Sequence, residues 1–104
     1  MSPRSGAPDK AAARRALLRR RVTIVNRRGL HARAAARFVK VAEQFHAKIT
    51  VAKDDMTVCG TSIMGLMMLA AAQGSTLEIR TGGREAEAAL AALAAFVEGG
   101  FDES

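Results

Sequence analysis

The sequence contains no tryptophan and no tyrosine, and it has one cysteine among its 104 residues. RNA-binding modules of the α+β class stack bases on aromatic side chains of a sheet face. The four phenylalanines of this chain fall instead in predicted helices or in the C-terminal tail, at positions 38, 45, 96 and 101. The single thiol, Cys59, excludes an internal disulfide and agrees with a reducing compartment. No apolar run is long enough for a membrane span or a signal-peptide core, so we expect a cytoplasmic protein without a membrane partner.

The positive charge of the chain is concentrated at its N-terminus. Lys and Arg number 16 against 10 Asp and Glu, which gives a formal net charge of +6. Residues 1–21 hold seven of the basic residues and one acidic residue, so this segment accounts for the whole excess. A body without net charge argues against a nucleic-acid surface spread over it, and we expect no nucleic-acid partner. We assign residues 1–20 to a basic, disordered extension and residues 21–104 to one folded domain.

Hydrophobic periodicity divides the folded body into strands and helices. Alternating or β-type runs predict four strands, over Val22–Asn26, Lys48–Lys53, Met56–Cys59 and Thr76–Thr81. Apolar residues at helical spacing predict three helices, from about Ala32 to Phe45, Ile63 to Ala72 and Arg84 to Val97. The β-α-β-β-α-β-α order predicts an α+β domain with helices on one face of an antiparallel sheet. The pattern alone is compatible with a ferredoxin-like sandwich and with an open-faced sandwich.

The segment from Asn26 to Ala35 combines a glycine turn, a histidine at the start of a predicted helix and an arginine two residues later. The backbone N–H groups of Ala32 and Arg33 open this helix, have no intrahelical acceptor and can bind the oxygens of an anion. The guanidinium of Arg33 also suits bidentate contact with a phosphoryl group. A neutral imidazole at His31 is a nucleophile near neutral pH. These residues predict a site at which His31 carries a phosphoryl group covalently.

The second histidine, His46, stands at the end of the same predicted helix, a helix length away from His31. We interpret it as a structural residue. No metal-ligand cluster, phosphate-binding glycine loop or Ser/His/Asp set accompanies it in the sequence. We therefore expect no cofactor, no metal and no autonomous enzyme activity.

Residues 29–35 read Gly-Leu-His-Ala-Arg-Ala-Ala and resemble the active-site motif of the HPr family. These proteins are the histidine phosphocarriers of the bacterial phosphoenolpyruvate-dependent phosphotransferase system. The family motif is Gly-Leu-His-x-Arg-Pro-Ala, so Ala34 is the one departure. A second family motif follows at residues 61–67, where Ser62 matches a serine that is a regulatory phosphorylation site in many HPr proteins. The two motifs occur in the family order and at a family-like separation.

The resemblance implies an open-faced β-sandwich, a four-stranded antiparallel sheet covered on one face by three helices. It also implies a monomeric carrier that accepts a phosphoryl group from phosphorylated Enzyme I on His31 and passes it to Enzyme IIA-type proteins. An HPr kinase/phosphorylase would act on Ser62, where the added negative charge could repel an acidic partner. The family also implies exposed methionines that dock partners, and we name Met64, Met67 and Arg37 as docking residues.

Two alternatives to this function remain open. An RNA-binding module would show salt-sensitive RNA binding that does not depend on residues 1–21. A regulatory HPr-like protein would act by docking without phosphoryl transfer, although the presence of both His31 and Arg33 argues against it. The sequence is compatible with a sugar-transport pathway and with a nitrogen-related regulatory pathway, and Ala34 favours the regulatory one slightly.

Overall fold

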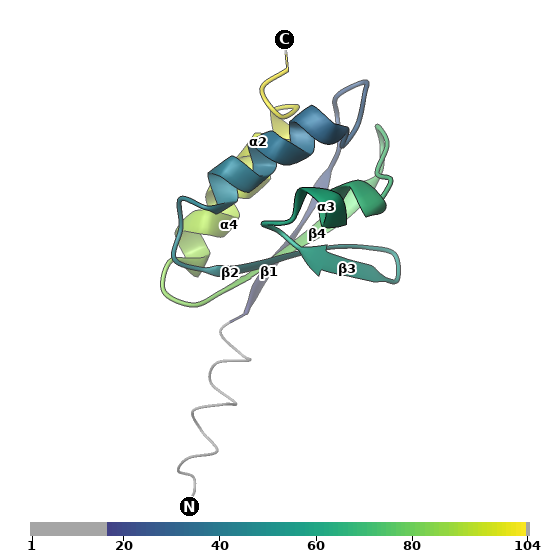
Figure 1. The fold of residues 1–104 in the computed structure, drawn as a ribbon. Coiled ribbons are helices and arrows are strands. Elements are labelled where there is room, and N and C mark those ends of the chain that lie inside the picture. The colour runs from purple at the N-terminus through teal and green to yellow at the C-terminus, as the bar shows by residue number, and fades with distance from the viewer. Residues whose placement is uncertain (1–16, 104) are drawn as a thin grey trace, which may run out of the picture.

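The structure, a computed structural model, describes residues 17–103. Within this range, strands and helices follow one another in the predicted order (Figure 1). The expectation of a disordered extension over residues 1–16 lies outside the described residues. The elements are β1 (Leu18–Thr23), α2 (Ala32–Ala42), β2 (Lys48–Lys53), β3 (Met56–Cys59), α3 (Ile63–Met68), β4 (Thr76–Gly82) and α4 (Ala86–Glu98).

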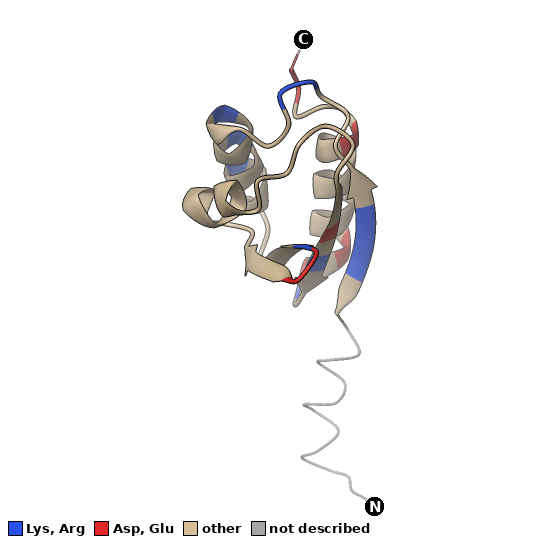
Figure 2. Ribbon diagram, turned by 90° about the vertical axis from the view of Figure 1, so that its right-hand side faces the viewer, with Lys and Arg blue, Asp and Glu red and all other residues tan. Residues whose placement is uncertain are grey.

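The four strands form one antiparallel sheet in the order β1-β4-β2-β3. Buried residues of the central strands lie opposite one another, as Val51 of β2 lies opposite Ile79 of β4. Because successive side chains of a strand point to opposite faces, these residues define the face that the helices cover. All three helices lie on that side, and the other face of the sheet is open (Figures 1 and 2). The predicted open-faced sandwich is confirmed.

The hydrophobic core lies between the sheet and the helices, and it includes a residue that the sequence placed in a tail. Phe101 follows α4 and is completely buried. Its ring packs edge to face on Phe96, with ring centroids 5.7 Å apart and an interplanar angle of 82°. The other completely buried large apolar side chains are Phe38, Ile24, Leu66, Leu77, Ile79, Leu93, Val22, Val51 and Val97. The C-terminal turn is therefore part of the domain core.

The first strand differs from its prediction, since it begins at Leu18 and ends at Thr23. Residues 18–20, which we assigned to the extension, thus belong to the sheet, and the boundary at residue 20 is corrected. Arg19 lies opposite Arg80 on the open face of the sheet, and Arg20 pairs with Glu98 of α4 at 3.4 Å. The run of arginines hid the strand because Arg19 lies on the open face, which accepts charged side chains, while Arg20 on the helix side pairs with Glu98, so that no apolar alternation remains to detect.

The helices are shorter than predicted at three of their six ends. The first ends three residues early at Ala42, and the second ends four residues early at Met68. A residue with positive φ, Ala70 at 49°, follows the second helix and prevents its continuation. The third helix starts at Ala86 rather than Arg84 and ends one residue beyond its predicted end, at Glu98. Apolar periodicity continued past these ends because the loops also bury side chains such as Leu69 and Ala71.

Candidate functional site

The turn that leads into α2 is built around Gly29, which has a φ of +69°. A Cβ atom at this position would lie 2.6 Å from the carbonyl oxygen of Ala71, so a larger residue does not fit without a shift of the backbone. The next residue, Leu30, is buried, and its N–H donates to the same carbonyl at 2.9 Å. These contacts fix the direction from which the chain enters α2 and so position the histidine that follows.

His31 is the N-cap residue of α2, and its side chain is 15% exposed. The backbone N–H of Ala34 donates to its Nδ1 at 3.4 Å, and its Nε2 contacts the carboxylate of Glu103. A donor beside Nδ1 requires an electron pair on that nitrogen, and an acceptor beside Nε2 requires a proton there. The hydrogen-bond partners therefore favour the tautomer with a free electron pair on Nδ1 and a proton on Nε2.

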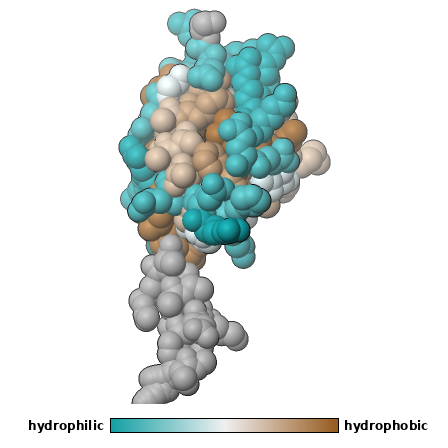
Figure 3. Space-filling model, turned by 90° about the vertical axis from the view of Figure 1, so that its left-hand side faces the viewer, coloured by the Kyte–Doolittle hydropathy of each residue, from teal (hydrophilic) through white to brown (hydrophobic). Residues whose placement is uncertain are grey.

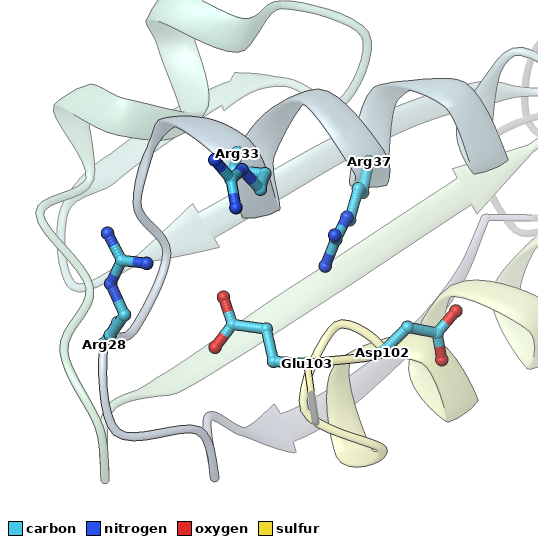
Figure 4. Close-up of a pocket in the computed structure, with 5 residues that line it drawn as sticks. All are labelled: Arg28, Arg33, Arg37, Asp102 and Glu103. Atoms are coloured by element: carbon cyan, nitrogen blue, oxygen red, sulfur yellow. The ribbon is translucent and has the colours of Figure 1, made fainter.

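Three arginines surround the approach to this histidine. Arg28 from the turn and Arg33 and Arg37 from successive turns of α2 line a cavity of about 250 Å³, with acidic residues of the C-terminal turn on its other side (Figure 4). Arg37 is half-buried and donates from Nη1 to the carbonyl oxygen of Phe101 at 3.2 Å. Within residues 17–103, no ion pair holds Arg28 or Arg33. Their guanidinium groups can therefore turn toward an anion at the start of α2.

Glu103 is the site residue that sequence reasoning missed. One carboxylate oxygen, Oε1, accepts from Nδ2 of Asn26 at 2.9 Å, and the other contacts His31. The hydrogen bond from His31, followed by that from Asn26, lowers the pKa of the Glu103 carboxyl. The sequence carried one usable signal for this contact, because an isolated phenylalanine after the two glycines that end α4 predicts an anchored turn rather than a free tail.

The exposed side of α2 is basic, since it carries Arg33 and Lys40, with Arg37 half-buried beside them. Lys and Arg residues occur along α2 beyond His31 and also in β1 (Figure 2). On the side of the molecule where α2 and α4 lie, hydrophilic side chains border a weakly apolar area (Figure 3). The exposed residues of α4 include Ala88, Ala91 and Ala95. This side thus offers hydrophilic side chains next to a weakly apolar area.

Ser62 is the N-cap residue of α3, and its Oγ accepts the backbone N–H of Gly65 at 3.0 Å. The short helix that follows leaves Met64 75% exposed and Met67 43% exposed, and Met68 is also exposed. These methionines lie on α3, which lies next to α2 (Figure 1). The apolar surface that they form is therefore separate from His31 but on the same side of the sheet.

The remaining predicted positions take no part in the site. His46 lies beyond the end of α2, where its N–H donates to the side chain of Glu85 at 2.6 Å, a contact made by the backbone. In residues 17–103, no group of three or more His, Cys, Asp and Glu could hold a metal ion. Nor does any helix of that stretch combine the length and the apolar character needed to cross a membrane.

An open-faced sandwich with a histidine N-cap beside free arginines is typical of a histidine phosphocarrier. The family model described as "PTS HPr component phosphorylation site" matches residues 18–99. The chain belongs to the HPr family, which supports a role as a carrier in the phosphotransferase system rather than as a catalyst.

Relatives from several bacteria agree with this assignment. The phosphocarrier protein HPr of Neisseria meningitidis serogroup A is 45% identical over 87 residues, which span 84% of this chain and 98% of the relative. The phosphocarrier protein NPr of Shewanella violacea is 41% identical over 87 residues, or 84% of this chain and 96% of the relative. The crystal structure of HPr from Bacillus anthracis matches with a TM-score of 0.76 and 50% identity, covering 79% of this chain and 98% of that one.

Proposed function

We propose that this protein accepts a phosphoryl group on Nδ1 of His31 from phosphorylated Enzyme I and passes it to Enzyme IIA-type acceptors. The single observation that carries the proposal is the position of Nδ1 at the N-terminus of α2, where it accepts the N–H of Ala34 at 3.4 Å. The first intrahelical hydrogen bond of α2 runs from Ala35 to the His31 carbonyl at 2.8 Å. The N–H groups of Ala32 and Arg33 precede it and are available to phosphoryl oxygens.

The chemistry of the carrier requires no proton transfer at the attacking atom. Nδ1 attacks the phosphorus atom, the N–P bond forms, and the bond between phosphorus and the donor breaks. The ring then carries a positive charge, because the proton on Nε2 stays in place. In the second half-reaction the acceptor attacks phosphorus, and the electron pair of the N–P bond returns to Nδ1. Arg33 and Arg28 neutralise part of the phosphoryl charge in both steps, and the α2 dipole adds a smaller contribution.

The alanine that replaces the family proline changes the surroundings of Nδ1. Proline has no N–H, whereas Ala34 donates one to Nδ1 at 3.4 Å. Once Nδ1 bonds to phosphorus it has no free electron pair, and this N–H becomes available to a phosphoryl oxygen. Ala34 is completely buried in the first turn of α2, where alanine and proline are both tolerated. The substitution therefore alters the phosphate site without disturbing the helix.

We also propose that partner proteins dock on the exposed methionines of α3 and on the basic side of α2. Met64 and Met67 supply adaptable apolar contacts, and Arg37 supplies positive charge near the histidine. This arrangement suits a monomeric carrier that binds unlike partners in turn.

An exposed free thiol at Cys59 agrees with work in the reducing cytoplasm.

Ser62 is the proposed regulatory residue, with an HPr kinase/phosphorylase as the enzyme that would modify it. Its hydroxyl lies at the N-terminus of α3, beside the exposed methionines. A phosphate there would place nearly two negative charges next to the proposed docking surface and would repel an acidic partner.

Intact-mass spectrometry after incubation with Enzyme I and phosphoenolpyruvate tests the carrier function. Wild type should gain one acid-labile phosphoryl group, and His31→Ala should gain none. His46→Ala is the matched control and should be phosphorylated like wild type. Absence of transfer from an active, cognate Enzyme I would contradict the proposal and favour a regulator that only docks.

A further inference from the structure

The C-terminal turn is held in place on two sides. Phe101 is completely buried, and its N–H donates to the carbonyl oxygen of Phe96 at 2.9 Å. Its own carbonyl oxygen accepts from Nη1 of Arg37, on α2, at 3.2 Å. Phe101 and Asp102 both have positive φ values, 57° and 59°, so the chain turns sharply back toward the start of α2. The residue after this turn, Glu103, is thereby brought into contact with the histidine, and its carboxylate points toward Arg28 and Arg33 (Figure 4).

Both carboxylate oxygens of Glu103 are engaged at the site. Oε1 accepts from Asn26 at 2.9 Å, and Oε2 contacts Nε2 of His31. Asn26 is itself fixed, because it is buried and its Nδ2 also donates to the carbonyl oxygen of Gly29 at 2.9 Å. The side chain of Glu103 is 20% exposed. A partly shielded carboxylate is thus aimed at the ring nitrogen opposite the one that would carry phosphorus.

We propose that Glu103 is a positioning residue that keeps a proton on Nε2 of His31 before and after phosphorylation. This inference rests on the proposed carrier function. In the free protein the carboxylate accepts the Nε2–H hydrogen bond, and the electron pair of the ring stays on Nδ1. In the phosphorylated protein the same carboxylate lies beside a positively charged ring, which it stabilises against loss of the Nε2 proton.

The proton on Nε2 matters for the second half-reaction. A ring that keeps this proton leaves phosphorus as a neutral imidazole, whereas a ring that has lost it would have to leave as an anion. The protonated form is therefore the better phosphoryl donor, and no proton needs to move while the N–P bond breaks. Glu103 thus extends to higher pH the range in which the carrier can pass on its phosphoryl group.

Other charged groups also face this ring, and they act in opposite directions. Arg28, Arg33 and Arg37 lie around the adjoining cavity. Their positive charges disfavour a positive charge on the ring of His31. Asp102 lines the same cavity, but its carboxylate makes no hydrogen bond to another side chain within residues 17–103. Glu103 is the acidic group in direct contact with the ring, so its removal should have an effect that removal of Asp102 does not.

The test compares Glu103→Gln with Asp102→Asn, a matched loss of one negative charge from the same turn. Nitrogen-15 NMR of the unphosphorylated ring reports the tautomer without any partner protein. The rate of phosphoryl transfer to an Enzyme IIA-type acceptor, followed against pH, reports the phosphorylated state. Glu103→Asp, whose carboxylate stands farther from the ring, should lie between wild type and Glu103→Gln in both measurements.

We expect wild type and Asp102→Asn to show the tautomer with the proton on Nε2 and the same pH profile. In Glu103→Gln the fraction of that tautomer should fall, and the midpoint of the transfer profile should move to lower pH by about one unit. At a pH above both midpoints, transfer should slow by about tenfold. A Glu103→Gln protein that is folded and keeps the wild-type tautomer and pH profile would overturn the inference. Wild type that Enzyme I never phosphorylates would contradict the carrier function instead, while the tautomer measurement would still decide whether Glu103 positions the ring.

Discussion

Truncation of Phe101 should show that the C-terminal turn is a stabilising part of this small domain. The side chain is completely buried and packs edge to face on Phe96 of α4. Phenylalanine-to-alanine changes in protein cores cost roughly 3–5 kcal/mol. We expect the lower value, about 3 kcal/mol, because a turn near the chain end can detach and close part of the cavity. For a domain of this size, that loss corresponds to a fall of about 12–24 °C in the midpoint of thermal unfolding.

Circular dichroism during heating measures this effect, and Phe101→Leu is the control. Leucine keeps an apolar side chain at the site and should lose much less stability than alanine. Phe101→Ala should also release Glu103 from His31, so the tautomer signal of the ring should change together with the unfolding midpoint. A loss of less than about 1 kcal/mol would contradict this role for Phe101, because it lies well below the range for buried phenylalanines.

Three further predictions concern the cap of α3, the turn at Gly29 and the contact of Glu103. Ser62→Ala should lose about 1 kcal/mol of unfolding free energy in a denaturant titration, because the cap on α3 is removed; an unchanged midpoint would contradict that role. Gly29→Ala should lose more than about 1 kcal/mol, given its positive φ and the 2.6 Å approach of a Cβ atom to the Ala71 carbonyl oxygen, and full stability would show that this turn readily rearranges. Because the pKa of Glu103 is lowered in the folded state, its contribution to stability is present above the ordinary carboxyl range and is lost as the pH falls through the lowered value. Wild type should therefore lose stability on acidification more steeply than Glu103→Gln, and parallel curves would contradict the contact.

The sequence predicted best those features that depend on neighbouring residues. The β2 and β3 strands have the predicted bounds, since alternation and the two aspartates between them define a hairpin locally. The histidine site was also predictable, because the glycine turn, the N-cap and the first helical turn are consecutive in sequence. The same is true of Ser62, whose capping contact spans three residues.

Features that depend on distant residues were missed. The start of β1 is determined by pairing with β4, a strand more than 50 residues away, and its arginines gave no apolar signal. The contact between Glu103 and His31 joins residues 72 positions apart and depends on the burial of Phe101. The isolated Phe101 indicates an anchored turn, but no local pattern specifies that this turn meets His31, because the contact forms only after α2 and α4 have packed on the same face of the sheet.

The most direct test of the account follows the phosphoryl group through both half-reactions. The phosphorylated protein is separated from Enzyme I and mixed with an Enzyme IIA-type acceptor, and the intact masses of both proteins are recorded over time. We expect the carrier to lose one phosphoryl group for each one that the acceptor gains, and His31→Ala neither to gain nor to pass on any. Phosphorylation at a residue other than His31, or loss of the group to water without gain by a competent acceptor, would contradict the account.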